Sequence, residues 1–283
     1  MLATVLMENR SPAPYRAEHG LCVHIAYRGK NYLLDTAKSG AFLENASRLG
    51  IDISKVHMAF LSHGHYDHSG GYPEFFEINK TAKVYLRETA GVGKHLSQKE
   101  DGLEDIGIPE GVLESYPDRF QFVSKDMQPD QGVWLIGHHT QNLRARAEAA
   151  GMYWEKNGET ALDDFSHEQS LVFETAAGLA VFNSCCHAGV DCVVKEISDT
   201  FPGQHIAAVI GGFHLMGSGG ADTMAGTEAE VRKLAEKLME EPVDRYYTGH
   251  CTGMPAYQIM KETMGDRLVY FSTGSQLELP ENR

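Results

Sequence analysis

The sequence has no apolar run long enough to cross a membrane, and it has few basic residues for its length. No stretch of its 283 residues approaches the roughly 20 apolar residues of a membrane-spanning helix. Its 25 Lys and Arg face 39 Asp and Glu, which gives a formal net charge of −14. Non-specific binding to nucleic acids or to anionic membranes needs a basic surface. We therefore expect neither as a partner, whereas a small phosphate ester is compatible where metal ions reverse the local field.

The chain contains few cysteines, and their number is odd. The five cysteines are Cys22, Cys185, Cys186, Cys192 and Cys251. An odd count, with two cysteines adjacent, is not the pattern of a disulfide framework, so it predicts reduced thiols. The N-terminus carries no basic leader before Glu8, and no secretory signal is expected. We therefore expect a cytoplasmic protein, whose oligomeric state the sequence leaves open.

The remaining composition is that of a globular protein, with 42% hydrophobic and 23% charged residues. Strands and helices alternate, which predicts one α/β domain over residues 1–283. Glycine, proline and charge dominate residues 87–165, where we expect a loop-rich insertion or lid, with a helix at 141–154 interrupted by Gly151. Elsewhere the hydrophobic patterns predict strands at 21–27, 31–34, 56–61, 169–174, 179–182, 206–210 and 243–247, and helices at 41–49, 231–239 and 255–264.

Histidine is the unusual feature of the composition, because the chain has 14 histidines and they cluster. The loop after strand 56–61 contains His63-x-His65-x-Asp67-His68, three imidazoles and a carboxylate beside three glycines. Imidazole and carboxylate are the ligands of borderline divalent ions such as zinc, iron or manganese. In a tight turn His63 and His65 can face one ion, and Asp67 and His68 a second. The pattern predicts a metal site rather than a solvated polar loop.

This loop resembles the signature of the metallo-β-lactamase superfamily. The resemblance implies an αββα four-layer sandwich with a dinuclear metal site at one edge. Asp35, at the end of its strand, is expected to orient His63 or His68 as a hydrogen-bond acceptor. The metal ligands that the resemblance implies are His63, His65, Asp67, His68, His187 and His250.

Further segments resemble one branch of that superfamily, and the similarity extends over nearly the whole chain. This branch includes the 7,8-dihydropterin-6-methyl-4-(β-D-ribofuranosyl)aminobenzene 5'-phosphate synthase. The resemblance implies a transferase acting on a pterin or phosphorylated small molecule. The alternative is a hydrolase of a phosphodiester, a lactone or another small ester. The segments are Ala17-Glu18-His19-Gly20-Leu21, Ser62-His63-Gly64-His65, Cys186-His187-Ala188-Gly189, Gly211-Gly212-Phe213-His214-Leu215 and His250-Cys251-Thr252-Gly253.

One strand end departs from the superfamily pattern. Superfamily hydrolases usually carry Gly-Asp after the strand that corresponds to 179–182, and that Asp bridges the two metals. Here Asn183-Ser184-Cys185-Cys186-His187 follows, without a carboxylate. Three interpretations stay open: His187 supplies a metal bond, Cys185 or Cys186 does, or the second metal site is weaker. A sulfur or nitrogen ligand at this position would alter the metal preference.

The remaining candidates flank the predicted centre. His214 ends a strand, and we expect it to act near the metals as a catalytic or substrate-binding group. His19 is expected to line the substrate pocket. His167 either binds metal or is a polar residue at a strand start, and His138 and His139 are further candidates for substrate contact.

We expect two divalent ions, zinc before iron or manganese, and a small-molecule substrate that is phosphorylated or pterin-like. Such ions act as Lewis acids on a phosphoryl, carbonyl or ring oxygen. Asp67 would hold one ion and accept a proton from the nucleophile, so the expected catalytic residues are Asp67 and His214. A metal-binding protein without turnover is the rival class, and the open coordination position beside six ligands argues against it.

Overall fold

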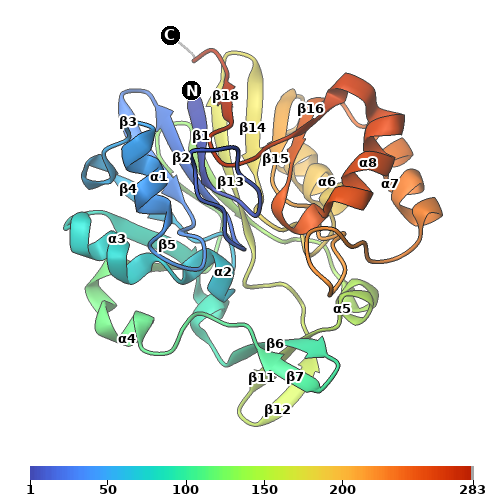
Figure 1. The fold of residues 1–283 in the computed structure, drawn as a ribbon, viewed down its shortest axis with the longest axis horizontal. Helices are drawn as coiled ribbons and strands as arrows, with labels where there is room; N and C mark the ends of the chain where they lie inside the picture. The colour runs from blue at the N-terminus through green and yellow to red at the C-terminus, as the bar shows by residue number, and fades with distance from the viewer. Residues whose placement is uncertain (282–283) are drawn as a thin grey trace.

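The computed structural model describes residues 1–281, in which two large sheets lie face to face between helices (Figure 1). The first sheet contains, in spatial order, β18 (Gln276–Glu278), β1 (Leu2–Met7), β2 (Cys22–Tyr27), β3 (Lys30–Leu34), β4 (Met58–Phe60), β5 (Lys83–Arg87) and β8 (Phe120–Val123). The second contains β17 (Leu268–Tyr270), β16 (Val243–Thr248), β15 (Ile206–Ile210), β14 (Gly178–Phe182), β13 (Gln169–Thr175), β10 (Val133–Gly137) and β9 (Met127–Asp130).

Three apolar layers hold this arrangement together. Successive strand residues point to opposite faces, and in β3 the side chains of Tyr32 and Leu34 enter the layer between the sheets while Leu33 enters an outer layer. The outer layer of the first sheet includes residues of α1 (Phe42–Arg48) and α3 (Tyr72–Ile78). The outer layer of the second sheet includes residues of α6 (Val190–Thr200), α7 (Glu228–Glu240) and α8 (Met254–Met264). The predicted αββα sandwich is confirmed.

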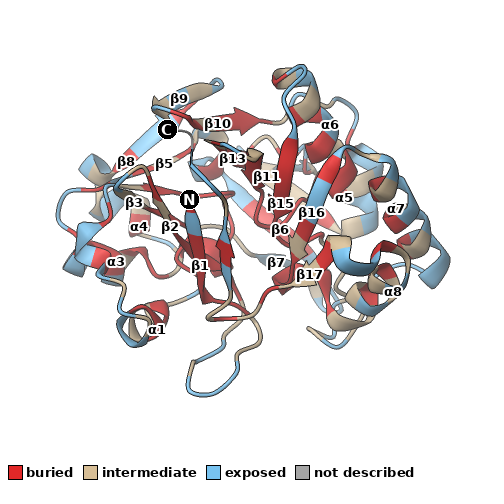
Figure 2. Cartoon of the chain, turned by 90° about the horizontal axis from the view of Figure 1, so that it is seen from above, coloured by how far each residue is buried: buried red, intermediate tan, exposed pale blue. Residues whose placement is uncertain are grey.

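The predicted elements around the core are confirmed with small shifts at their ends. Helix α7 begins behind a capping box, in which Thr227 accepts a hydrogen bond from the Glu230 backbone while the Glu230 side chain accepts one from the Thr227 backbone. Figure 2 shows that exposed residues gather on the outer faces of α7 and α8, whereas buried residues dominate the strands behind them. No helix within residues 1–281 is long and apolar enough to span a bilayer.

The segment 87–165 contains more regular structure than its composition indicates. A separate antiparallel sheet lies below the sandwich in Figure 1, with the order β12 (Glu159–Leu162), β11 (Met152–Lys156), β6 (Lys94–Lys99) and β7 (Gly102–Asp105). Two helices, α4 (Val112–Ser115) and α5 (Arg144–Ala150), lie in the same segment. The prediction of a helix continuing to residue 154 is wrong, because Gly151 ends α5 in a left-handed conformation at φ +63°.

The histidine-rich segment is also not entirely a loop. Residues Tyr66–Ser69 form the helical turn α2, which carries Asp67 and His68. The turn brings the ring of His68 to 4.2 Å from that of His63, and the ligand atoms of His63, Asp67 and His68 lie within 4.8 Å of one another.

Candidate metal centre

The strand ends that carry the predicted ligands meet at one edge of the sandwich. Strands β14, β15 and β16 run parallel, and β4 runs parallel to β3 in the facing sheet. The C-terminal ends of parallel strands open on the same edge of a sheet, where α/β proteins commonly bind ligands. All six predicted metal ligands are between 0% and 7% exposed there: His63, His65, Asp67, His68, His187 and His250.

Asp67, His68, His250 and Cys185 form the first ligand group. The Nε2 atoms of His68 and His250 are 3.1 Å apart, and they lie 3.5 and 3.4 Å from Asp67 Oδ2. Cys185 Sγ lies 3.3 Å from His68 Nε2. Ligands arranged tetrahedrally around zinc, at about 2.0–2.3 Å from the ion, are separated from one another by roughly 3.3–3.7 Å. The spacing of these four side chains fits a divalent ion.

His63, His65 and His187 form the second group beside it. Their ring centroids are 4.5, 4.9 and 4.7 Å apart, and each pair of rings is nearly perpendicular. The ligand atoms of His63, His187 and Cys185 lie within 4.8 Å of one another. His63 Nε2 is buried without a hydrogen-bond partner among the described residues, which is costly for a polar atom unless a ligand completes the site.

The outer ring nitrogens of three histidines are fixed by oxygen acceptors. Nδ1 of His68 lies 2.7 Å from Asp35 Oδ2, and Nδ1 of His187 lies 2.5 Å from Glu168 Oε2. Nδ1 of His250 lies 2.9 Å from Asn9 Oδ1. Since carboxylate and amide oxygens only accept hydrogen bonds, Nδ1 donates in each of these rings, which leaves Nε2 directed at the centre as the atom that can bind a metal ion.

The inner atoms of the first group share a positive charge even without a metal. Burial alone would lower the pKa of His68, but Asp67 and Asp35 raise it to about 10. Its Nε2 lies 3.1 Å from His250 Nε2, within hydrogen-bond distance, and a divalent ion would take the place of the proton between them. Burial alone would raise the pKa of Asp67, but His68, His19 and His250 together hold it well below its ordinary value. The residues therefore fit divalent metal ions, and the expectation that Asp35 orients a motif histidine is confirmed for His68.

Several residues of the centre adopt strained backbone conformations. Asp35, Cys186, His214 and His250 have positive φ angles of 59°, 46°, 52° and 47°. Left-handed backbone is uncommon for residues other than glycine and gathers at functional sites. A hydrogen bond of 2.5 Å from the His250 backbone N–H to Glu8 Oε1 holds one of them in place.

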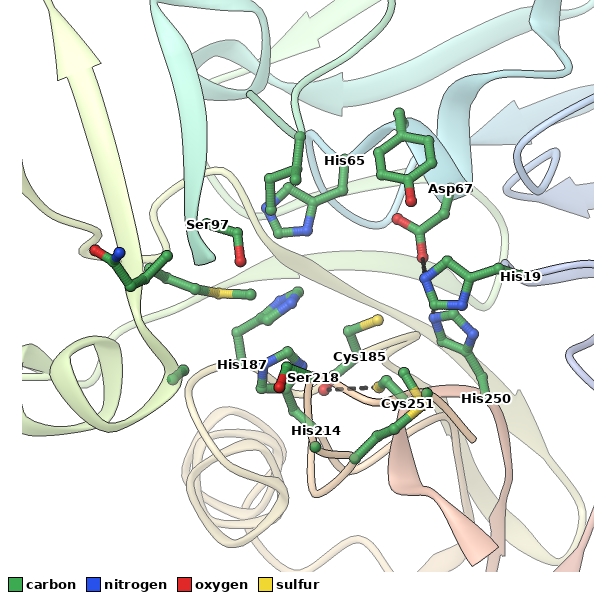
Figure 3. A pocket seen from close by; sticks show the side chains of 18 of the residues that line it. His19, His65, Asp67, Ser97, Cys185, His187, His214, Ser218, His250 and Cys251 are labelled. Carbon is green, nitrogen blue, oxygen red and sulfur yellow. Dashed lines mark hydrogen bonds and ion pairs between the residues drawn. The ribbon is translucent and has the colours of Figure 1, made fainter. Parts of the chain in front are cut away.

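A cavity of about 370 Å³ opens beside the two groups, between the sandwich and the small sheet (Figure 3). The two residues predicted to contact substrate, His19 and His214, both line it. His19 Nε2 lies 3.2 Å from Asp67 Oδ2, and the ring of His214 lies 4.6 Å from that of His187. The small sheet contributes the opposite wall, which includes Ser97, Gln98, Lys99 and Met152.

His167 lies on the far side of His65 from the first group. Its Nδ1 accepts a hydrogen bond of 3.1 Å from the Gly64 backbone N–H, which fixes the motif loop. Its Nε2 lies 3.2 Å from Asp163 Oδ2, and the centroid of the His95 ring from β6 lies 4.0 Å from that of His167, with the two rings tilted by 40°. The ligand atoms of His65, His95 and His167 also lie within 4.8 Å of one another. Sequence reasoning gave no indication of His95 or Asp163, because their contacts with the motif are long-range.

His138 lies behind the second group rather than in the cavity. Its two ring nitrogens lie 2.8 Å from Glu168 and 2.8 Å from Glu196, and the ring is buried. A chain of contacts therefore runs from Glu196 through His138 and Glu168 to His187. His139 points to solvent beside Asp126. Neither His138 nor His139 lines the cavity, so their expected contact with a substrate there is not supported.

Comparisons with known proteins agree with this geometry. The family model of the Metallo-beta-lactamase superfamily matches residues 15–141. A crystal structure described as a metal-dependent hydrolase of the beta-lactamase superfamily is 30% identical, with a TM-score of 0.83, and the match covers 99% of this chain and 100% of that chain. The chain belongs to the metallo-β-lactamase superfamily.

Within the superfamily, the chain is similar to proteins with different reactions. The 7,8-dihydropterin-6-methyl-4-(β-D-ribofuranosyl)aminobenzene 5'-phosphate synthase of Methanocaldococcus jannaschii is 27% identical over 88% of this chain and 86% of that protein. A diphosphatase of the PhnP family shares the fold at 17% identity and a TM-score of 0.55, with 99% of each chain covered. The predicted resemblance to the synthase branch is confirmed as a similarity in sequence.

The buried His138 leads to a prediction about stability at alkaline pH. Burial alone would lower its pKa, but Glu168 and Glu196 raise it from 6.5 to about 10. The stabilisation is therefore complete below the unfolded-state pKa of 6.5 and is lost as the pH rises to about 10. In metal-free protein, we expect this group to lower the free energy of unfolding across the window by up to about 1.4 kcal/mol per pH unit. His138→Gln should remove this contribution and leave that of His68, whose pKa is also raised to about 10.

Denaturant unfolding at a series of pH values in the presence of a chelator measures this slope. The exposed neighbour His139→Gln is the matched control and should keep the wild-type pH dependence. An unchanged slope in His138→Gln would show that the ring is not charged in the folded protein.

Proposed function

We propose that the protein is a two-metal enzyme that acts on a small phosphorylated molecule. The observation that supports this most directly is the pair of ligand groups beside one cavity, with His68 and His250 in one group and His63 and His187 in the other. Two bound ions would supply Lewis acidity to an oxygen of the substrate. We assign them to the six predicted ligands, and zinc is favoured over iron or manganese by the predominance of imidazole.

Two further side chains are placed to handle protons. Asp67 Oδ2 lies 3.2 Å from His19 Nε2, and the side chain of His19 is 38% exposed at the cavity. A carboxylate held ionised and connected to an accessible imidazole can accept a proton and pass it outwards. His214 borders the cavity on the opposite side, with its buried Nδ1 unpartnered among the described residues. We infer that Asp67 accepts the proton and that His214 contacts the substrate.

The small sheet supports an anionic substrate. Lys99 is the one Lys or Arg among the described residues that line the cavity, and Ser97 and Gln98 precede it on the same strand. These side chains offer a positive charge and hydrogen-bond donors opposite the ligand groups. A phosphate group bound there would leave the rest of a small molecule facing the metal centre.

Group transfer is the first candidate reaction. The similarity to the synthase, 27% identity over 88% of the chain, supports a condensation. In it, the amine nitrogen of the aminobenzene would form a C–N bond to the methylene carbon on the dihydropterin, the C–O bond to diphosphate would break, and the amine proton would pass to a base. Hydrolysis of a phosphodiester, lactone or other small ester is the second candidate. It is supported by the 30% identity to the protein described as a metal-dependent hydrolase.

A direct assay separates the two reactions. Metal-loaded protein is incubated with dihydropterin hydroxymethyl diphosphate and ribofuranosylaminobenzene 5'-phosphate, and separately with bis(p-nitrophenyl) phosphate and an acyl lactone. Mass spectrometry follows the coupled product, and absorbance or pH follows hydrolysis. We expect the coupled product, and ester hydrolysis without coupling would assign the protein to the hydrolases.

Metal content tests the two-ion site independently of substrate. Elemental analysis is expected to give about two divalent ions per chain, and His187→Ala should reduce this to about one, because the second group loses a ligand. His205→Ala, at an exposed histidine paired with Asp244, is the control and should keep both ions. A wild-type protein that takes up no metal on titration would contradict the proposed function.

Asp67→Asn is expected to reduce turnover far more than stability. The amide keeps the shape of the side chain but loses the proton-accepting charge, so we expect the rate constant to fall by about 100-fold or more. Single-turnover kinetics on whichever substrate the wild type converts measures the rate, and thermal unfolding of the metal-free protein measures stability. The exposed Asp118→Asn is the control. Near-normal turnover of Asp67→Asn would refute its assigned role.

A further inference from the structure

The thiol of Cys185 occupies a central position between the two ligand groups. It follows β14 in the segment where superfamily hydrolases usually carry their bridging carboxylate, and it is 3% exposed. In Figure 3 its sulfur points into the space between His187 and His250. No carboxylate stands in residues 183–187, so the position needs another ligand if two ions are to share one.

Both groups include this thiol. The ligand atoms of His63, His187 and Cys185 lie within 4.8 Å of one another, and so do those of His68, His250 and Cys185. The two sets have no other member in common. An atom within reach of two separate pairs of inward-facing imidazoles is in the position of a bridging ligand.

The other two thiols nearby are hydrogen-bonded to backbone oxygens. Cys186 Sγ donates to the Asn183 carbonyl oxygen at 3.4 Å. Cys251 lines the cavity, but its Sγ donates to the Cys185 carbonyl oxygen at 3.7 Å. Neither belongs to a potential metal-binding group among residues 1–281. Of the two adjacent cysteines that the sequence leaves as alternatives, this geometry favours Cys185.

The charges of the centre also require an additional anion. Two divalent ions a few ångströms apart repel each other strongly in a buried site. The carboxylates of Asp35 and Glu168 are occupied by the outer nitrogens of His68 and His187, so Asp67 is the one carboxylate directed at the ions. A thiol that binds a divalent ion loses its proton, and its negative charge would then lie between both ions.

We propose that the Cys185 thiolate is the ligand shared by the two metal ions, in place of the bridging carboxylate. The proposal rests on the proposed two-metal function and adds the identity of the shared ligand. A thiolate favours softer ions such as zinc or iron(II) over manganese or magnesium. The chain should therefore differ in metal preference from superfamily members with a carboxylate bridge.

Cobalt(II) titration tests the shared ligand without any substrate. Metal-free, reduced protein is titrated with Co²⁺ under anaerobic conditions, and bound metal is counted while thiolate-to-cobalt absorption is recorded in the near ultraviolet. We expect two ions and a thiolate band in the wild type. Cys185→Ser should lose the band and bind the second ion more weakly, by about 10- to 100-fold or more, since even the loss of an outer-shell partner costs that much.

Two matched variants sharpen the result. Cys186→Ser should keep both ions and the band, because its sulfur faces Asn183. Cys185→Asp should bind two ions again but without the band, because the carboxylate restores a shared anion. Circular dichroism of each metal-free variant confirms that the fold is intact.

The outcomes separate this proposal from the function on which it rests. A band that survives in Cys185→Ser, or one that disappears in Cys186→Ser, would overturn the shared thiolate while leaving the two-ion enzyme standing. A wild-type protein that binds two ions without any thiolate band would do the same. Failure of the wild type to bind two ions would overturn both.

Discussion

The centre of this protein depends on buried imidazoles whose Nε2 atoms are held close to one another. His68 and His250 bring their Nε2 atoms to 3.1 Å, and neither ring can turn away without breaking its outer hydrogen bond to Asp35 or Asn9. Two neutral lone pairs, or two protonated rings, would repel at that distance, so one proton lies between them, carried by His68 beside Asp67 and Asp35. A divalent ion can take the place of that proton, because the fixed rings already direct both Nε2 atoms at the centre.

Asp35 is the residue that connects this constraint to the architecture. Its carboxylate accepts hydrogen bonds from the backbone and side chain of Ser62, at 2.8 and 2.8 Å, and from His68 at 2.7 Å. It also accepts one of 2.7 Å from the Ser184 hydroxyl, at the end of β14 in the facing sheet. One buried carboxylate thus fixes the motif loop and the segment that carries Cys185. These hydrogen bonds connect the two sheets at the edge where the proposed ligands meet.

The sequence predicts the parts of this arrangement that local pattern determines. Alternating apolar residues locate β2, β3 and β15, the Thr227 capping box locates α7, and the histidine motif locates the centre. The outer acceptors Glu168 and Asn9 are not predictable, because each reaches its histidine from a distant segment. The small sheet is not predictable from the sequence either. In it β6 pairs with β11, with Ser97 opposite Met152, and no local sequence pattern specifies pairing between strands so far apart in the chain. Position in the sequence suggests Cys185 and Cys186 equally, and their different surroundings are visible only in the three-dimensional structure.

The proposed metal ligands and the facing wall of the cavity come from different parts of the fold. Every proposed metal ligand comes from the sandwich or its strand-end loops, whereas Ser97, Gln98 and Lys99 on β6 form the opposite wall of the cavity. Side chains on that wall can change without disturbing the hydrogen bonds that fix the ligands. Function on a shared fold is determined by such locally variable surfaces. A transferase and a hydrolase can therefore share the same centre and differ in the wall that holds the substrate, and in this chain that wall offers a lysine suited to an anionic group.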